Sequence, residues 1–146
     1  MKQLQLVSRW EQDKEQRFAN EFRIAENELN AQKQKLQSLE QYRVEYLQQI
    51  QSTGKEGVDA QHYHQHLSFV AKLDKACEQQ NEVIARADMV AQQRKAKWLQ
   101  QQQRRKAVDK LIENKQSELA IRAARQEQSM LDELANQRFF RMRKQS

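Results

Sequence analysis

The sequence predicts an all-α protein in which two long helices form an antiparallel coiled-coil hairpin and the second helix overhangs the first. The composition is too polar for a thick globular core, since 38% of the residues are hydrophobic, 32% are charged and the mean hydropathy is −1.10. Residues that favour helix abound and proline is absent, which argues against a disordered chain. Both glycines, Gly54 and Gly57, lie in the stretch QSTGKEGVDA at residues 51–60 and mark a single reversal of the chain.

The first helix is expected over about residues 3–52, because apolar side chains recur there at alternating steps of four and three. This spacing is that of the a and d positions of a coiled-coil seam. Ahead of the seam, Leu4, Val7 and Trp10 are expected to continue an apolar face in a shifted phase. The seam positions are Phe18, Phe22, Ala25, Leu29, Gln32, Leu36, Leu39, Arg43, Tyr46 and Ile50.

The second helix is expected over about residues 59–140, after a glycine loop at residues 53–58 and with Asp59 as its N-cap. Its apolar residues form one strong column with a period of seven and a weaker companion column that includes Leu67 and Leu73. Such a narrow stripe suits a seam between two helices better than a globular core. The strong column contains Tyr63, Val70, Cys77, Ile84, Ala91, Trp98, Ile112 and Leu119, and Arg105 interrupts it.

The short loop fixes the register of the two helices. Helices joined by so few residues are antiparallel neighbours, so the whole chain is expected to form one coiled-coil domain, residues 1–146. If Ile50 faces Tyr63, Trp98 lies near Lys14 and Phe18.

In this register the first helix ends opposite about residue 112, and residues 113–146 have no partner within the chain. This overhang still carries large apolar side chains, among them Leu119, Phe139 and Phe140. It is either a partner-binding surface or a frayed chain end.

The net charge of +6 is concentrated in a basic belt at residues 90–112, which carries seven basic side chains and one acidic one. A local belt points to a local acidic partner more than to a general polycation. One interpretation is a nucleic-acid-binding coiled coil in which Trp98 stacks on a base. Because Trp98 belongs to the seven-residue column, burial in the seam is the competing interpretation. A generic homodimeric coiled coil, in which the second helix pairs with its twin, is a further alternative.

No motif indicates an enzyme, a cofactor or a small-molecule substrate. Two glycines cannot build a glycine-rich phosphate loop, and a two-helix rod offers no enclosed pocket in which carboxylates would be perturbed. His62 and His66 have the spacing of metal ligands, but with His64 they fit surface residues at a helix start better than a metal site.

The single cysteine, Cys77, fits a small core residue in a reducing cytosol. No apolar run approaches the length of a signal segment or a membrane span, so the protein is expected to be cytoplasmic.

A second candidate surface lies near the loop, where two rows of residues come close in the predicted register. Some of its members belong to the seam and others lie beside it, so the rows either widen the apolar stripe or form a docking face. The first row is Leu39, Tyr42 and Tyr46, and the second is Phe69, Leu73, Ala76 and Gln80.

Several stretches resemble the flagellar FliJ family across essentially the whole chain. They are LEQYRVEYLQQI from Leu39, the glycine-containing loop, FVAKLDKACEQQNEVI from Phe69, and MLDELANQRFFRMRK from Met130. Length, two-helix layout, basic charge and the Leu39, Tyr42 and Tyr46 spacing also match.

The resemblance implies a non-enzymatic component of the flagellar type III export apparatus, cytoplasmic and peripherally associated with the inner membrane at the flagellar base. Members of this family form an antiparallel coiled coil like the central stalk of rotary ATP synthases. They insert into the centre of the export ATPase ring, promote its assembly, contact the export-gate membrane protein and handle export chaperones. The resemblance implies no nucleic acid partner.

The resemblance also implies two sets of site residues. The export-gate surface corresponds to Leu39, Tyr42, Tyr46, Phe69, Leu73, Ala76 and Gln80, where Gln80 departs from the histidine that can occur in the family. The ATPase-facing end corresponds to the N-terminal turns and residues 113–146, including Met130, Leu131, Asp132, Glu133, Leu134, Arg138, Phe139 and Arg141.

Overall fold

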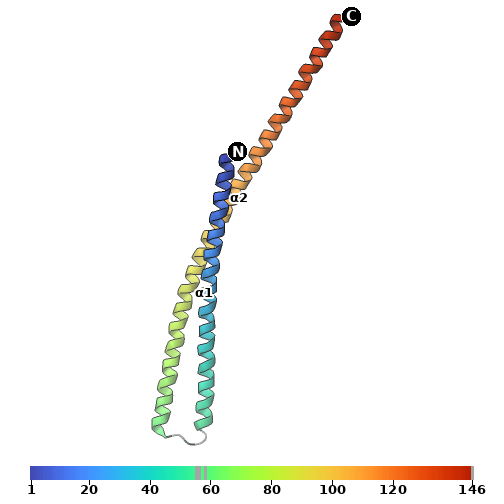
Figure 1. The fold of residues 1–146 in the computed structure, drawn as a ribbon. Helices are drawn as coiled ribbons and strands as arrows, with labels where there is room; N and C mark the ends of the chain where they lie inside the picture. The colour runs from blue at the N-terminus through green and yellow to red at the C-terminus, as the bar shows by residue number, and fades with distance from the viewer. Residues whose placement is uncertain (55–56, 58, 146) are drawn as a thin grey trace. The chain divides into compact units, whose positions relative to one another are not determined.

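The protein consists of two helices, α1 (Lys2–Gly54) and α2 (Ala60–Gln145), in a computed structural model that describes residues 1–54, 57 and 59–145, and the side chains up to residue 144 (Figure 1). Of the described residues, all but Met1, Gly57 and Asp59 are helical. The all-α prediction is confirmed, and the two helices pack antiparallel as a hairpin. α1 starts one residue before the expected position, and α2 continues five residues beyond it.

The reversal between the helices depends on Gly57, whose φ of 83° lies in the left-handed region that favours glycine. Its amide donates to the Gly54 carbonyl at 3.3 Å. Gly54, expected in the loop, is the last residue of α1. The remaining members of the expected loop, Lys55, Glu56 and Val58, lie outside the described residues.

Asp59 caps α2, as predicted. Its Oδ1 accepts a hydrogen bond from the His62 backbone amide at 2.9 Å, which satisfies one of the free amides of the first turn. This backbone hydrogen bond, and next the side-chain hydrogen bond from His62, lower the pKa of the Asp59 carboxyl.

Contacts within the chain define two compact units, each described here by itself. The hairpin unit comprises Glu15–Gln100. The terminal unit comprises Met1–Lys14 and α2 from Gln101 onward.

In the hairpin unit the predicted seam of α1 is confirmed, because all ten of its positions are buried or half-buried. Leu29 of α1 and Leu73 and Ala91 of α2 are the buried apolar side chains. The α2 positions that face the seam are spaced alternately by four and three in the same way, and they are His66, Val70, Leu73, Cys77, Gln80, Ile84, Ala87, Ala91 and, after a gap, Trp98.

Close to the loop the seam is open. Tyr63 and Leu67, expected on the α2 stripe, are both more exposed than buried. They line a groove of about 460 Å³ together with Leu47 and Ile50. The expectation that they are covered fails because the facing side chains do not close over this groove.

The contacts of Tyr46 with His66 and of Gln32 with Gln80 lie within one helical turn of the predicted register, whereas the contact of Trp98 lies about two turns from it. Trp98 was expected near Lys14 and Phe18 but stacks on Phe22, with ring centroids 5.8 Å apart and an interplanar angle of 12°. Side chains on a helix tilt toward its N-terminus. In an antiparallel pair, Phe22 and Trp98 therefore lean toward each other, and Lys97 takes the place over the Phe18 ring, 4.3 Å from its centroid.

Candidate interaction surfaces

The first candidate surface is an aromatic cluster of Tyr42, Tyr46, His66 and Phe69 in the hairpin unit. Tyr46 lies at the centre, with its ring centroid 4.7 Å from that of Phe69 and 5.6 Å from that of His66. Its hydroxyl is 2.6 Å from His66 Nδ1, in a hydrogen bond that joins α1 to α2. Tyr42 meets Phe69 edge-on at 6.3 Å and is 49% exposed.

The structure brings together only part of the predicted gate-facing set. Tyr42, Tyr46 and Phe69 are in ring contact, whereas Leu73 is buried in the seam. The Gln80 amide donates to the carbonyl and to the side-chain oxygen of Gln32, both at 2.8 Å, and is therefore committed to a contact between the helices. The remaining members, Leu39 and Ala76, are half-buried.

His66 was missed by sequence reasoning as a member of this cluster. Hydrophobic periodicity ranks apolar residues, and His66 was grouped with His62 and His64 as a surface histidine. The available signal was position: His66 lies four residues before Val70, where the alternating four-and-three spacing of the α2 seam begins.

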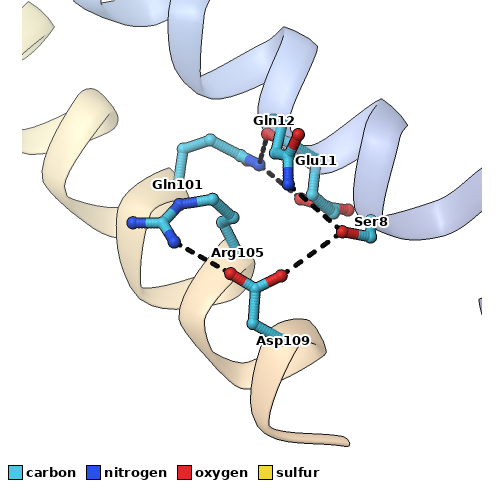
Figure 2. A network of polar contacts seen from close by, with 6 residues as sticks. All are labelled: Ser8, Glu11, Gln12, Gln101, Arg105 and Asp109. Atoms are coloured by element: carbon cyan, nitrogen blue, oxygen red, sulfur yellow. Dashed lines mark hydrogen bonds and ion pairs between the residues drawn. The ribbon is translucent and has the colours of Figure 1, made fainter. Parts of the chain in front are cut away.

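In the terminal unit the contact between α1 and α2 includes a group of hydrogen-bonded polar side chains. This polar seam consists of Ser8, Glu11, Gln101, Arg105 and Asp109 (Figure 2). The Gln101 amide donates to the Glu11 carbonyl at 3.1 Å and also to the Glu11 carboxylate. Asp109 accepts from Ser8 at 3.3 Å and from Arg105 at 2.9 Å. Gln101 is 2% exposed and Glu11 9%, so these hydrogen bonds replace apolar packing.

Val7 and Trp10 lie on an apolar face in a phase shifted from the seam, as expected, and this face is exposed. Val7 is 40% exposed and Trp10 58%, and the covered positions are Leu4, Ser8 and Glu11, which keep the original phase. In an uninterrupted α-helix the residues on one face keep the same spacing along the whole length. The N-terminal part of α1 thus presents an exposed apolar face, on which the Lys14 ammonium lies 3.8 Å from the centroid of the Trp10 ring.

Within the overhang, residues 116–144 of α2 are exposed at every position. Figure 1 shows α2 running past the N-terminus of α1 without a second helix beside it. Of the predicted ATPase-facing residues, Met130, Leu134, Arg138 and Arg141 share one helix face by their spacing. Asp132 accepts a hydrogen bond from Gln128 on the same helix at 3.1 Å. Ser146, the last residue of the expected region, lies outside the described residues.

The set is mixed in character around the helix. By their spacing, Leu131 and Glu133 flank the face of Met130 and Leu134 on its two sides, while Phe139 points away from it. Phe139 meets the exposed Phe140 at 6.3 Å between ring centroids.

Several cations of the basic belt are engaged within the chain. Arg94 and Lys97 lie 3.7 and 4.0 Å from the Glu21 carboxylate, and Lys110 lies 3.9 Å from that of Glu113. Trp98 is half-buried against Phe22, as its place in the seven-residue column predicts. Its ring is therefore occupied by a stacking contact inside the hairpin unit.

No cluster of three or more His, Cys, Asp or Glu side chains in the part of the chain that the structure describes is placed to hold a metal ion. Neither described helix has a stretch long and apolar enough to cross a membrane.

Comparison with known families gives one match. The family model described as "Flagellar FliJ protein" matches residues 1–144. The comparisons with curated proteins and with solved structures find no match. The matched range includes the aromatic cluster, the polar seam and the overhang up to residue 144.

Proposed function

The chain belongs to the flagellar FliJ protein family, which gives it a role related to flagellar export, and on this premise we propose that it is a stalk and adaptor of the export apparatus. It binds the export ATPase ring, promotes ring assembly and couples the ring to the export gate and to export chaperones. The family is a non-enzymatic flagellar component. The protein works in the cytoplasm, attached peripherally at the inner membrane.

The observation that carries this proposal is the overhang. A stretch of helix with large apolar side chains and every position exposed gains little stability from its own chain. Burying such side chains in a partner is favourable by about 25 cal/mol per Å². We assign the overhang, together with the exposed N-terminal face around Trp10, to the ATPase ring.

The aromatic cluster supports the second half of the proposal. Tyr42 and Phe69 lie in the hairpin unit, and the overhang lies in the terminal unit. The proposal therefore assigns one surface to each of two partners. Aromatic side chains of this kind are enriched in the centres of protein interfaces. We assign this surface to the export gate, with Leu39, Ala76 and Gln80 as its flanking residues.

The test is co-sedimentation of the full chain with the export ATPase, followed by electron microscopy of ring assembly. Met130→Gln combined with Leu134→Gln removes apolar surface from one face of the overhang and keeps good helix formers. We expect this variant to lose most binding and ring promotion.

The matched control is Ser129→Gln combined with Asn136→Gln, which changes exposed polar residues of the same segment on another helix face. It is expected to bind as the unchanged chain does. Undiminished binding and ring assembly by the Met130 and Leu134 variant, or by a chain ending at residue 115, contradicts the assignment of the overhang.

A further inference from the structure

The hydrogen bond between Tyr46 and His66 is the link that connects the two helices within the aromatic cluster. Tyr46 occupies a seam position of α1, and His66 occupies the facing seam position of α2. Both side chains are half-buried, and the hydroxyl oxygen is 2.6 Å from Nδ1. When the imidazole is neutral with its proton on Nε2, Nδ1 accepts the hydrogen bond and the Tyr46 hydroxyl donates it.

Ring contacts connect the Tyr46 and His66 pair to the exposed Tyr42 ring and so determine how that ring is oriented. The Tyr46 ring is hydrogen-bonded at its hydroxyl end and packs on the Phe69 ring. The two centroids are 4.7 Å apart and the interplanar angle is 59°. The Phe69 ring in turn contacts the Tyr42 ring edge-on, with centroids 6.3 Å apart and an interplanar angle of 82°. His66 therefore has no ring contact with Tyr42 and acts on it only through Tyr46 and Phe69.

The other two histidines of this stretch do not share this arrangement. His62 Nδ1 is 2.8 Å from the Asp59 carboxylate at the start of α2, and His64 is exposed. His66 is thus the histidine of the three that joins the aromatic cluster.

We propose that His66 is a positioning residue of the gate-facing surface, which fixes Tyr46 by accepting a hydrogen bond from its hydroxyl and so holds Phe69 and Tyr42 in the orientation that the partner binds. This inference rests on the proposed function, because it names a further residue of the same surface. The partner surface it fits is an apolar groove that takes an aromatic ring.

The test uses the full chain with His66→Asn and His66→Gln. The amide group of Asn reaches the place of Nδ1, whereas that of Gln reaches the place of Nε2. Affinity is measured for the purified cytoplasmic part of the export-gate protein. We expect His66→Gln, His66→Ala and Tyr46→Phe each to weaken binding about five- to tenfold, which is the worth of one ordinary hydrogen bond. His66→Asn is expected to keep most of the affinity of the unchanged chain.

A merely structural role is separated by two readouts. The Tyr46→Phe and His66→Ala double variant is expected to bind no more weakly than either single variant, because both remove the same bond. In the free chain, the nuclear Overhauser contact between the Tyr42 and Phe69 rings is expected to weaken with Gln and to persist with Asn. Equal behaviour of Asn and Gln in both measurements, or additive losses in the double variant, overturns the inference.

The reference variant is Tyr42→Ala. If it weakens gate binding while the His66 variants bind as the unchanged chain does, the positioning role is wrong and the gate surface stands. If Tyr42→Ala and every His66 variant leave affinity unchanged, the gate surface itself is wrong, and the inference falls with it.

Discussion

Glu11 and Gln101 show how single residues of the terminal unit hold the two helices together. A buried polar group is costly unless it is hydrogen-bonded, and a buried charge is more so. The Gln101 amide donates to the carbonyl and to the carboxylate of Glu11, so both the buried amide and the buried charge are hydrogen-bonded. The pair therefore fixes which residues face each other rather than adding much net stability, as a polar residue at a coiled-coil a position does.

Removing one partner of this pair is expected to open the N-terminal part of α1. Glu11→Ala leaves the buried Gln101 amide without its carboxylate, at a cost of about 1–3 kcal/mol. Because this segment can open without unfolding of the whole chain, the measurement is amide hydrogen exchange of residues 5–14.

The control for this prediction is Asp13→Ala, an exposed neighbour, which is expected to leave exchange nearly unchanged. Glu11→Leu combined with Gln101→Leu replaces the pair by apolar packing and is expected to restore protection. Exchange in Glu11→Ala that is no faster than in Asp13→Ala contradicts the role of the pair.

At the scale of the helices, sequence periodicity predicted α1 well where large apolar side chains fill the heptad, from Phe18 to Ile50. At the N-terminal end it did not identify the covered positions, because it follows apolar side chains and these lie in another phase there. The spacing of Leu4, Ser8 and Glu11 continues that of the strong seam, so these residues are covered although two of them are polar. Hydrogen bonds of Ser8 to Asp109 and of Glu11 to Gln101 offset the cost of covering these polar side chains. Hydrophobic periodicity does not detect such polar pairs.

The same reasoning explains how much of the aromatic cluster was predictable. The loop length set the register, and the register placed Tyr42 and Tyr46 beside Phe69. His66 and the Gln80 contact with Gln32 were not predicted, because each depends on one polar side chain meeting one partner across the seam.

The connection between the helices gives a paired prediction at its two glycines. Gly57→Ala forces an alanine into positive φ, and we expect it to lower the free energy of unfolding by about 1 kcal/mol or more. Gly54→Ala places an alanine at a helical position where its Cβ meets no atom within 4 Å. We expect that variant to be neutral or to stabilise the protein by up to about 1 kcal/mol.

Urea denaturation followed by circular dichroism measures both glycine variants, and each is the control for the other, since they differ in backbone conformation and not in available space. Equal effects of the two alanines contradict the assignment of the reversal to Gly57.

At the scale of the whole molecule, the segment assigned to the ATPase is the one that contributes least to the stability of the fold. Deleting residues 116–146 removes no covered side chain of the described part, because positions 116–144 are all exposed. We therefore expect the deletion to leave the thermal midpoint within about 2 °C, while a loss of 1 kcal/mol shifts a domain of this size by roughly 2–8 °C.

The two measurements for this deletion are a thermal scan by circular dichroism and light scattering at the same concentration. A midpoint that falls by more than about 4 °C, with the full chain scattering as a dimer and the shortened chain as a monomer, shows that the overhang pairs with a second copy. That outcome favours a homodimeric coiled coil over a stalk. An unchanged midpoint with a monomer in both cases leaves the apolar face of the overhang free for the ATPase ring.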